Sequence, residues 1–142
     1  MRKKTDIIKS QMNRVRVFLL KGKEDMIDHV KSVKELGCCY WKKAANKRLQ
    51  IGDICYLFLS GKGHNQIRYR LIVKEVSCRR EDKNCWKIPY KEDFDCYKLV
   101  PTSKMYSGDK LSREKLEDIG ISRYVQFKEL NNSQADFLDK FF

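Results

Sequence analysis

Trp41 lies in a strongly basic stretch of the chain, an arrangement that can hold a nucleobase. Four cations follow it within a few residues: Lys42, Lys43, Lys47 and Arg48. A flat indole ring can stack on a base while nearby cations bind phosphates. Trp86, the other of the two tryptophans in the chain, can supply a second wall of a base pocket. These residue types predict a binding module.

Motifs typical of catalysis are poorly represented in the sequence. The Gly61-Lys62-Gly63 stretch lacks the rest of a phosphate-binding loop, and it precedes an expected strand instead of a helix. No serine elbow, HExxH motif or pair of catalytic carboxylates can be picked out. A nuclease could use scattered acids such as Asp53, Glu75 and Asp93, but no motif supports that interpretation. We therefore expect that the chain is not an enzyme.

The chain contains six cysteines but no typical metal-binding or redox spacing. No C-x-x-C pair is present, and His29 and His64 are not spaced to complete a zinc site. Cys55 lies within an apolar run and is expected to be a small buried side chain. We predict reduced thiols, no metal site and no cofactor.

Positive charge is concentrated toward the N-terminal side of the sequence. The formal net charge is +12. Residues 1–48 contain 14 Lys or Arg against 5 Asp or Glu, whereas residues 92–142 contain 8 against 10. This asymmetry favours one basic face directed at a polyanion, although a lysine-rich solvated surface would give similar counts.

Length and hydropathy favour one cytoplasmic domain. The longest apolar run, around 55–59, is far shorter than the roughly 18–20 residues of a membrane span. The first residues lead into no apolar segment typical of a signal peptide. With 142 residues, the chain has room for a single core. We expect a basic extension at 1–13, one domain at 14–142, no membrane partner and a cytoplasmic location.

Hydrophobic periodicity and turn residues predict an α+β fold. Five strands are expected, at 14–20, 54–59, 67–76, 96–100 and 124–127. Helices are expected at 24–36 and 112–119, and a last one from a capping box at 133–136. The segment 54–59 is apolar on both faces and should be buried on both. These elements predict a small curved or closed sheet of five to six strands with two to three helices.

Two local details of these elements bear on the site. Glu24 and Asp25 are expected in the first turn of the first helix, where its dipole favours anions, and Gly37 should end that helix. Trp41 would then follow the helix, in a short link to the next strand. In the strand 67–76, Arg68, Arg70 and Lys74 are expected on the face opposite the apolar residues, as solvated surface or as a binding row.

The order of these pieces resembles the YTH and EVE families of the PUA-like superfamily. The resemblance runs over roughly residues 14–130. It includes the strand ending in 18–21, Trp41, the strand 56–60 with its hairpin 61–64, and a Leu…Gly-Ile pattern at 116–121. The later pieces fit an EVE-like domain better. The resemblance implies a PUA-like β-barrel that binds a modified nucleobase in an aromatic cage.

The resemblance also implies roles for individual residues. Trp41 matches the first cage tryptophan of YTH domains, and Trp86 resembles the second. Asp25 falls where those domains read the base edge, and the backbone carbonyl of Lys42 would accept a hydrogen bond from the modified amine. Ser60, beside the hairpin, completes the candidate base-binding set.

Cations around these positions are candidates for phosphate binding. They are Lys21, Lys23, Lys43, Lys47, Arg48, Lys62, Arg68 and Arg70. Each candidate also has a plain structural interpretation: the tryptophans as core rings, Asp25 as a helix-dipole partner, and Ser60 as part of an ordinary hairpin.

The favoured function is recognition of a flipped modified base, with DNA favoured over RNA. The base is methylated cytosine, hydroxymethylated cytosine or methyladenine. EVE-like domains are often the DNA-reading part of modification-dependent restriction systems, so a nuclease or motor subunit, fused or associated, is an expected partner. One alternative is an RNA-binding PUA-like module that recognises methyladenine or structured RNA. Another is a small-molecule or protein-interaction domain whose tryptophans are structural.

Overall fold

The computed structural model describes residues 15–44 and 48–142. The strands in this part of the chain are β1 (Val17–Lys23), β2 (Cys39–Lys42), β3 (Ile54–Ser60), β4 (Gln66–Cys78), β5 (Cys96–Pro101) and β6 (Phe127–Glu129). The helices are α2 (His29–Leu36), α3 (Arg113–Asp118), α4 (Asn132–Asp139) and the short 3₁₀ helix η1 (Lys83–Cys85). The expected extension at 1–13 lies outside the described residues.

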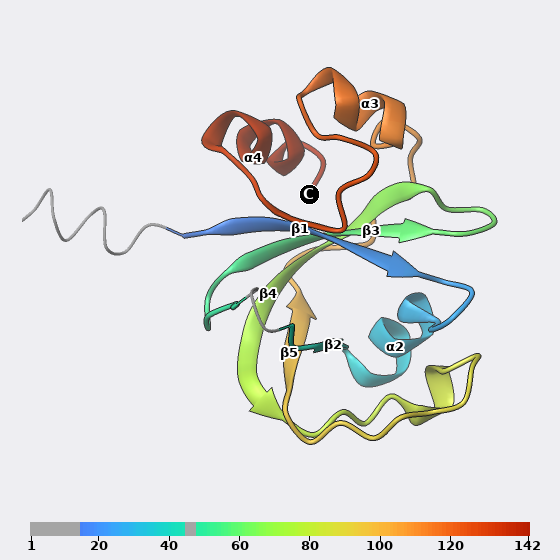
Figure 1. The fold of residues 1–142 in the computed structure, drawn as a ribbon. Coiled ribbons are helices and arrows are strands. Elements are labelled where there is room, and N and C mark those ends of the chain that lie inside the picture. The colour runs from blue at the N-terminus through green and yellow to red at the C-terminus, as the bar shows by residue number, and fades with distance from the viewer. Residues whose placement is uncertain (1–14, 45–47) are drawn as a thin grey trace, which may run out of the picture.

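The six strands form a single curled sheet in the order β2-β5-β4-β3-β1-β6. β1 and β3 are parallel, and the other neighbouring strands are antiparallel. Figure 1 shows α2 inside the curl, beside β2 and β5, while α3 and α4 cover the outer side of β1 and β3. The predicted α+β fold with a small curved sheet is therefore confirmed.

The central strand β3 is buried on both faces, as its unbroken apolar sequence predicts. Cys55, Leu57 and Leu59 join the core that packs against α2. Their neighbours on the other face, such as Tyr56 and Phe58, pack with side chains of α3 and α4. The sheet therefore separates two cores, one inside the curl and one beneath the C-terminal helices.

The first helix begins later than the apolar spacing predicts. Asp28 is its N-cap and accepts a hydrogen bond from Lys31 N, and Gly37 ends it in a left-handed conformation as expected. Residues 24–28 form a turn instead, because the Glu24 carboxylate turns back to the backbone N–H of His29. The prediction that Glu24 and Asp25 occupy the first helical turn is wrong.

Two other local predictions need correction. Trp41 lies within the strand β2, which pairs with β5, and not in a link after the helix. The last helix has its capping box at Asn131 and Gln134, two residues before the predicted start. The cap at Ser112 on α3 is confirmed.

Candidate nucleic-acid interface

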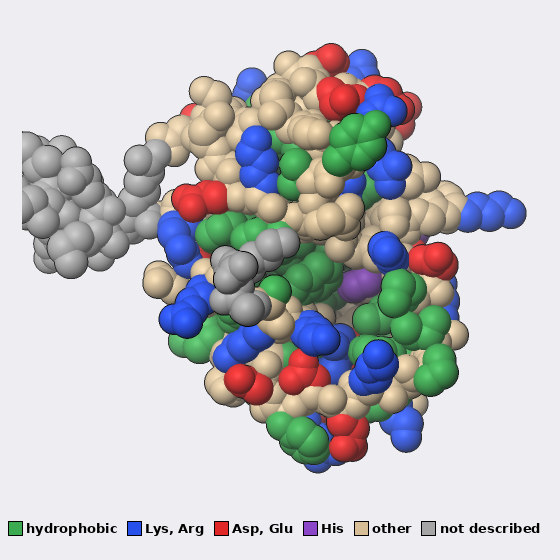
Figure 2. Space-filling model, viewed as in Figure 1, with side chains coloured by type: hydrophobic (Ala, Val, Ile, Leu, Met, Phe, Trp, Pro, Cys, Tyr) green, Lys and Arg blue, Asp and Glu red, His purple; other side chains and the backbone are tan. Residues whose placement is uncertain are grey.

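A cavity of about 390 Å³ lies beside β1, β2 and the start of α2, and both tryptophans line it. We call it the tryptophan cavity. The remaining lining residues are Lys21, Gly22, Lys23, Met26, Ile27, His29, Tyr40, Lys42 and Arg80. Figure 2 shows a hollow below β1 with hydrophobic and basic side chains around it. The cavity combines aromatic walls with a cationic rim.

Trp41 is held on β2, where it pairs with Tyr97 across the ladder to β5. Its ring is half-buried and packs against the core inside the curl. The ring centroid lies 5.9 Å from that of His29, with the planes tilted by 39°. A strand position gives the indole a fixed direction, and its half-exposed state leaves ring surface for a ligand.

Trp86 is fixed by a buried ion pair. Its Nε1–H donates to Asp82 Oδ1 at 3.1 Å, and the Arg80 guanidinium lies 4.7 Å from the ring centroid. Tyr90 meets the ring edge-on, with centroids 5.0 Å apart. These contacts set the orientation of a half-buried indole that follows a short 3₁₀ helix.

Arg80 and Asp82 together hold the Trp86 side chain in place. They form a bidentate pair with two N···O distances of 2.9 Å, and both side chains are almost fully buried. Burial opposes the charged form, but the hydrogen bonds and charge of Asp82 outweigh it and raise the pKa of Arg80. Arg80 also donates to the carbonyl of Tyr40 at 3.4 Å, which joins the Trp86 loop to β2.

Backbone hydrogen bonds join the same loop to the turn between β1 and α2. Asp28 N donates to Cys85 O, and Lys87 N donates to Met26 O, both at 2.8 Å. Ile27 and Trp86 form an isolated antiparallel bridge. Segments about sixty residues apart therefore meet and bring the two tryptophans to one cavity.

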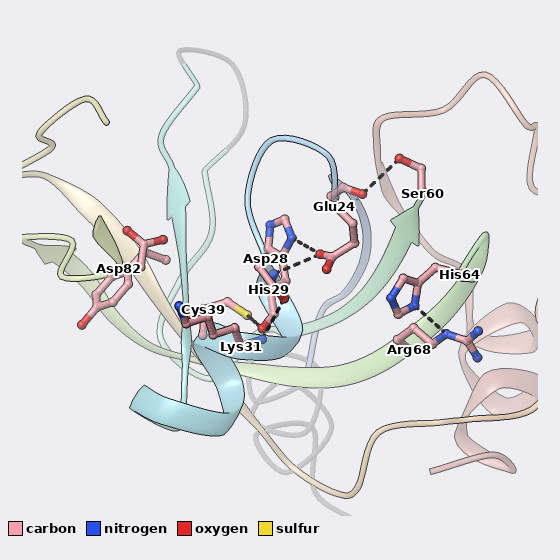
Figure 3. Close-up of polar contacts among 12 residues, drawn as sticks. Glu24, Asp28, His29, Lys31, Cys39, Ser60, His64, Arg68 and Asp82 are labelled. Carbon is pink, nitrogen blue, oxygen red and sulfur yellow. Dashed lines mark hydrogen bonds and ion pairs between the residues drawn. The ribbon is translucent and has the colours of Figure 1, made fainter. Parts of the chain in front are cut away.

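His29 and Glu24 form a buried polar pair at this cavity (Figure 3). Glu24 Oε1 lies 2.5 Å from His29 Nδ1 and accepts the His29 backbone N–H at 3.0 Å. Both side chains are less than a tenth exposed. Of the two residues, His29 lines the cavity and places a polar ring at its wall.

Three predicted ligand-contacting cations, Lys21, Lys23 and Lys42, line the cavity. Lys21 donates to the carbonyl of Arg123 and lies over the Phe58 ring. Burial and the neighbouring charge of Arg113 lower its pKa. A cation held in this way gains from an incoming anion, because phosphate would offset both effects.

Asp25, Ser60 and Lys62 do not line the tryptophan cavity. Asp25 and Lys62 line a neighbouring hollow of about 450 Å³ with Asp28 and His64. The Ser60 hydroxyl donates to Gly22 O at 3.3 Å, and the Ser60 carbonyl accepts from Glu24 N. The structure therefore does not bring the expected base-edge reader, Asp25, to the two tryptophans.

The remaining predicted cations differ in their surroundings. Lys43 binds Asp95 at 2.7 Å and lies over the Tyr97 ring. Arg48 is exposed, and its carbonyl accepts from Arg16. Lys47 lies outside the described residues.

The expected solvated surface is wrong for Arg68, which is buried, whereas Arg70 is half-buried and Lys74 is exposed. Arg68 is 7% exposed, and its guanidinium binds the carbonyls of Gly63, Tyr106 and Gly108 and the His64 ring. Arg70 binds Asp139 and the Thr102 hydroxyl. The C-terminal segment covers this face of β4, which periodicity within the strand cannot reveal.

Sequence reasoning missed Glu24, His29, Arg80 and Asp82 as parts of the site. Glu24 carried the signal of a helix start, and Arg80 and Asp82 lay in a polar stretch that indicates an exposed loop. Their burial depends on contacts between distant segments, so no local pattern identifies it. The chain contains two histidines, and this scarcity was the one feature of the sequence that drew attention to His29.

Other features give no support for a different kind of site. Within 15–44 and 48–142, no group of three or more His, Cys, Asp or Glu could hold a metal ion, and all six cysteines are free. Cys55 is fully buried, as predicted. No helix in the described ranges is long and apolar enough to cross a membrane. A larger hollow of about 910 Å³ near Arg16 and Asp53 has no aromatic lining.

Comparison with family models and with curated proteins found no match by sequence. Solved structures do match. Rpa0253 from Rhodopseudomonas palustris aligns with a TM-score of 0.60 at 14% identity, over 89% of this chain and 92% of that one. Human THYN1, solved in complex with DNA containing 5-methylcytosine, aligns with a TM-score of 0.56 at 11% identity, over 87% and 95%. ASCH from Zymomonas mobilis aligns with a TM-score of 0.53 at 6% identity, over 87% and 94%.

The fold is PUA-like. At these identities the likeness concerns the fold alone, and each neighbour's ligand is a property of that neighbour. The PUA-like fold that the resemblance implies is therefore confirmed. The narrower EVE or YTH assignment stays a prediction.

Proposed function

We propose that this PUA-like chain is a nucleic-acid-binding domain that accommodates a flipped, modified base in the tryptophan cavity. The favoured ligand is modified DNA, and the domain binds without catalysing a reaction. One observation carries the proposal: Trp41 and Trp86, the two tryptophans of the chain, come from distant segments and line the same cavity.

The size and lining of the cavity suit a single heterocycle. Its volume of about 390 Å³ falls at the lower end of the roughly 300–1,000 Å³ typical of ligand pockets. A methyl group adds no hydrogen-bonding information, so flat apolar walls are the natural means to detect it. In this proposal the Lys42 carbonyl accepts from the base amine, and Lys21, Lys23 and Lys42 contact the flanking phosphates.

The energies are consistent with base flipping. Extruding a base from a duplex costs a few kcal/mol. Stacking on an aromatic side chain contributes about 1–3 kcal/mol per base. Two tryptophan walls with edge hydrogen bonds can offset extrusion, whereas a single wall falls short. In this proposal the contacts with Asp82 and Arg80 fix the position of the second wall, Trp86.

The structural neighbours support the proposal through the shared fold, but they do not identify the ligand of this chain. THYN1 shares the fold and was solved with DNA containing 5-methylcytosine. We further propose that the domain supplies specificity in a modification-dependent restriction system, fused to or associated with a nuclease or motor subunit. The EVE-like resemblance in the sequence supports this role.

The test is a binding panel of DNA and RNA oligonucleotides of one sequence. Each is unmodified or carries 5-methylcytosine, 5-hydroxymethylcytosine or 6-methyladenine. We expect tighter binding to a modified DNA than to its unmodified counterpart, with affinity that falls as salt rises. A preference for RNA would favour the RNA-binding alternative. Absence of nucleic-acid binding at low salt would contradict the proposal and leave a small-molecule or protein-interaction domain.

A further inference from the structure

His29 places an unpartnered polar atom at the tryptophan cavity. The residue is 4% exposed and lines the cavity. Its Nδ1 is bonded to Glu24, but no hydrogen-bond partner for Nε2 occurs among the described residues. Nε2 is not among the buried side-chain atoms that lack a partner, so it keeps accessible surface and can hydrogen-bond a ligand that enters the cavity.

Glu24 determines what Nε2 offers to a ligand. A carboxylate is only an acceptor, so the Nδ1 atom 2.5 Å from Glu24 Oε1 carries the proton. In the neutral ring, Nε2 then carries the lone pair and acts as an acceptor. Glu24 is itself fixed, because its Oε1 accepts the His29 backbone N–H and its own N–H donates to Ser60 O.

The surrounding elements fix the position of the ring. His29 is the first residue of α2, directly after the N-cap Asp28. A Cβ atom at Gly22 would lie 2.9 Å from His29 Cε1 and 3.1 Å from Nε2, so β1 leaves just enough space for the imidazole. The centroid of the Trp41 ring lies 5.9 Å from that of the His29 ring. A rigid acceptor beside an aromatic wall can read the edge of a stacked base.

We propose that His29 Nε2 accepts a hydrogen bond from the exocyclic amine of the flipped base, which makes the cavity selective for amino-bearing bases over keto bases. This inference rests on the proposed function and names its ligand class. 5-Methylcytosine and thymine both carry a 5-methyl group, but position 4 bears an amine in one and a carbonyl in the other. The carbonyl of thymine would meet the Nε2 lone pair and leave both acceptors unpaired.

The experiment compares two duplexes that differ at one position, 5-methylcytosine opposite G and thymine opposite G. A mismatched base is easier to extrude, so any preference for 5-methylcytosine arises in spite of that advantage. For the wild-type protein we expect about tenfold tighter binding to 5-methylcytosine.

Two matched histidine variants identify the source of this preference. His29→Asn keeps a side-chain N–H for Glu24 and removes the Nε2 acceptor, so the preference should fall well below tenfold, and any remainder is due to the Lys42 carbonyl. His64→Asn makes the same change at the other histidine, which accepts from Arg68 and lines the neighbouring hollow. This control should retain the wild-type preference.

Failure of this inference differs from failure of the proposed function. If folded His29→Asn still prefers 5-methylcytosine over thymine about tenfold, His29 does not read the base and the inference is overturned. The proposed function is tested separately, by whether the wild-type protein binds modified DNA more tightly than unmodified DNA.

If His29→Asn does not fold, a measurement on the wild-type protein tests the same inference. ¹⁵N NMR of the two histidine rings should show the His29 proton on Nδ1, with an Nε2 signal that moves on binding 5-methylcytosine DNA. The His64 ring should be unaffected. A His29 ring protonated on Nε2 in both free and bound states at neutral pH would rule the acceptor out.

Discussion

Ion pairs in this protein should contribute unequally to its stability, and the buried Arg80–Asp82 pair should contribute most clearly. Asp82→Ala leaves the buried Arg80 guanidinium unpaired and frees the Trp86 indole N–H. We predict a loss of about 3–5 kcal/mol in the free energy of unfolding. Urea denaturation measures it. The exposed pair of Arg123 with Glu117 gives the control, since Glu117→Ala should cost only about 0.2–1 kcal/mol. Equal effects would mean that the pair does not support the Trp86 loop.

Trp41 is the residue on which discrimination should depend most. Trp41→Ala removes one wall of the cavity while the cations at its rim remain. We predict loss of the preference for modified DNA, with weak, salt-sensitive binding retained. Fluorescence anisotropy with matched labelled oligonucleotides measures both affinities. If a folded variant lost affinity equally for modified and plain oligonucleotides, Trp41 would have no role in reading the modification.

The helix α2 positions His29, and α4, which also has a side-chain N-cap, serves as its control. Asp28→Ala removes the side-chain cap of α2, and Asn131→Ala removes that of α4. Each should lower the free energy of unfolding by about 1 kcal/mol, measured by urea denaturation. Only the α2 change should also weaken binding of modified DNA, because His29 is the first residue of that helix. Equal binding losses would show that the α2 cap has no particular link to the cavity.

Elements with strong local signals were predictable from the sequence. The run 54–59 predicted a buried strand, because a strand buried on both faces needs apolar residues at every position. Gly37 predicted the end of α2, because glycine readily adopts the left-handed conformation found there. The start of α2 was missed since Glu24 bonds to His29 and not to a helix terminus. The solvated face expected for Arg68 was wrong because the segment around Tyr106 covers it.

At the scale of the whole molecule, the net charge of +12 predicts strong dependence on salt. Lys42 lies at the tryptophan cavity, whereas Lys104 lies at a hollow beside Phe141 and Phe142. Lys42→Glu should weaken binding to all sequences alike and reduce the slope of log affinity against log salt by about 1. Lys104→Glu changes the net charge equally and should leave the slope close to the wild-type value. Titrations at several salt concentrations measure both, and equal slopes for the two variants would count against a phosphate contact at Lys42.

The site itself was predictable only in part. Aromatic residues among cations identified Trp41 and Trp86, because ring type and local charge are visible in the sequence. Lys21, Lys23 and Lys42 also reached the cavity. Asp25 did not, since its position relative to the tryptophans depends on where α2 begins. The polar atoms that now matter most, on His29 and Glu24, are placed by contacts between distant segments.

The central claim, that a modified base enters between the two tryptophans, is tested most directly by intrinsic fluorescence. Trp41 and Trp86 are the protein's two tryptophans and both line the cavity, so their emission reports on its occupancy. We predict that DNA containing 5-methylcytosine quenches this emission in step with binding followed by anisotropy, and that unmodified DNA of the same sequence, bound to the same extent, quenches it much less. Complete binding of the modified DNA with unchanged tryptophan emission would contradict the account.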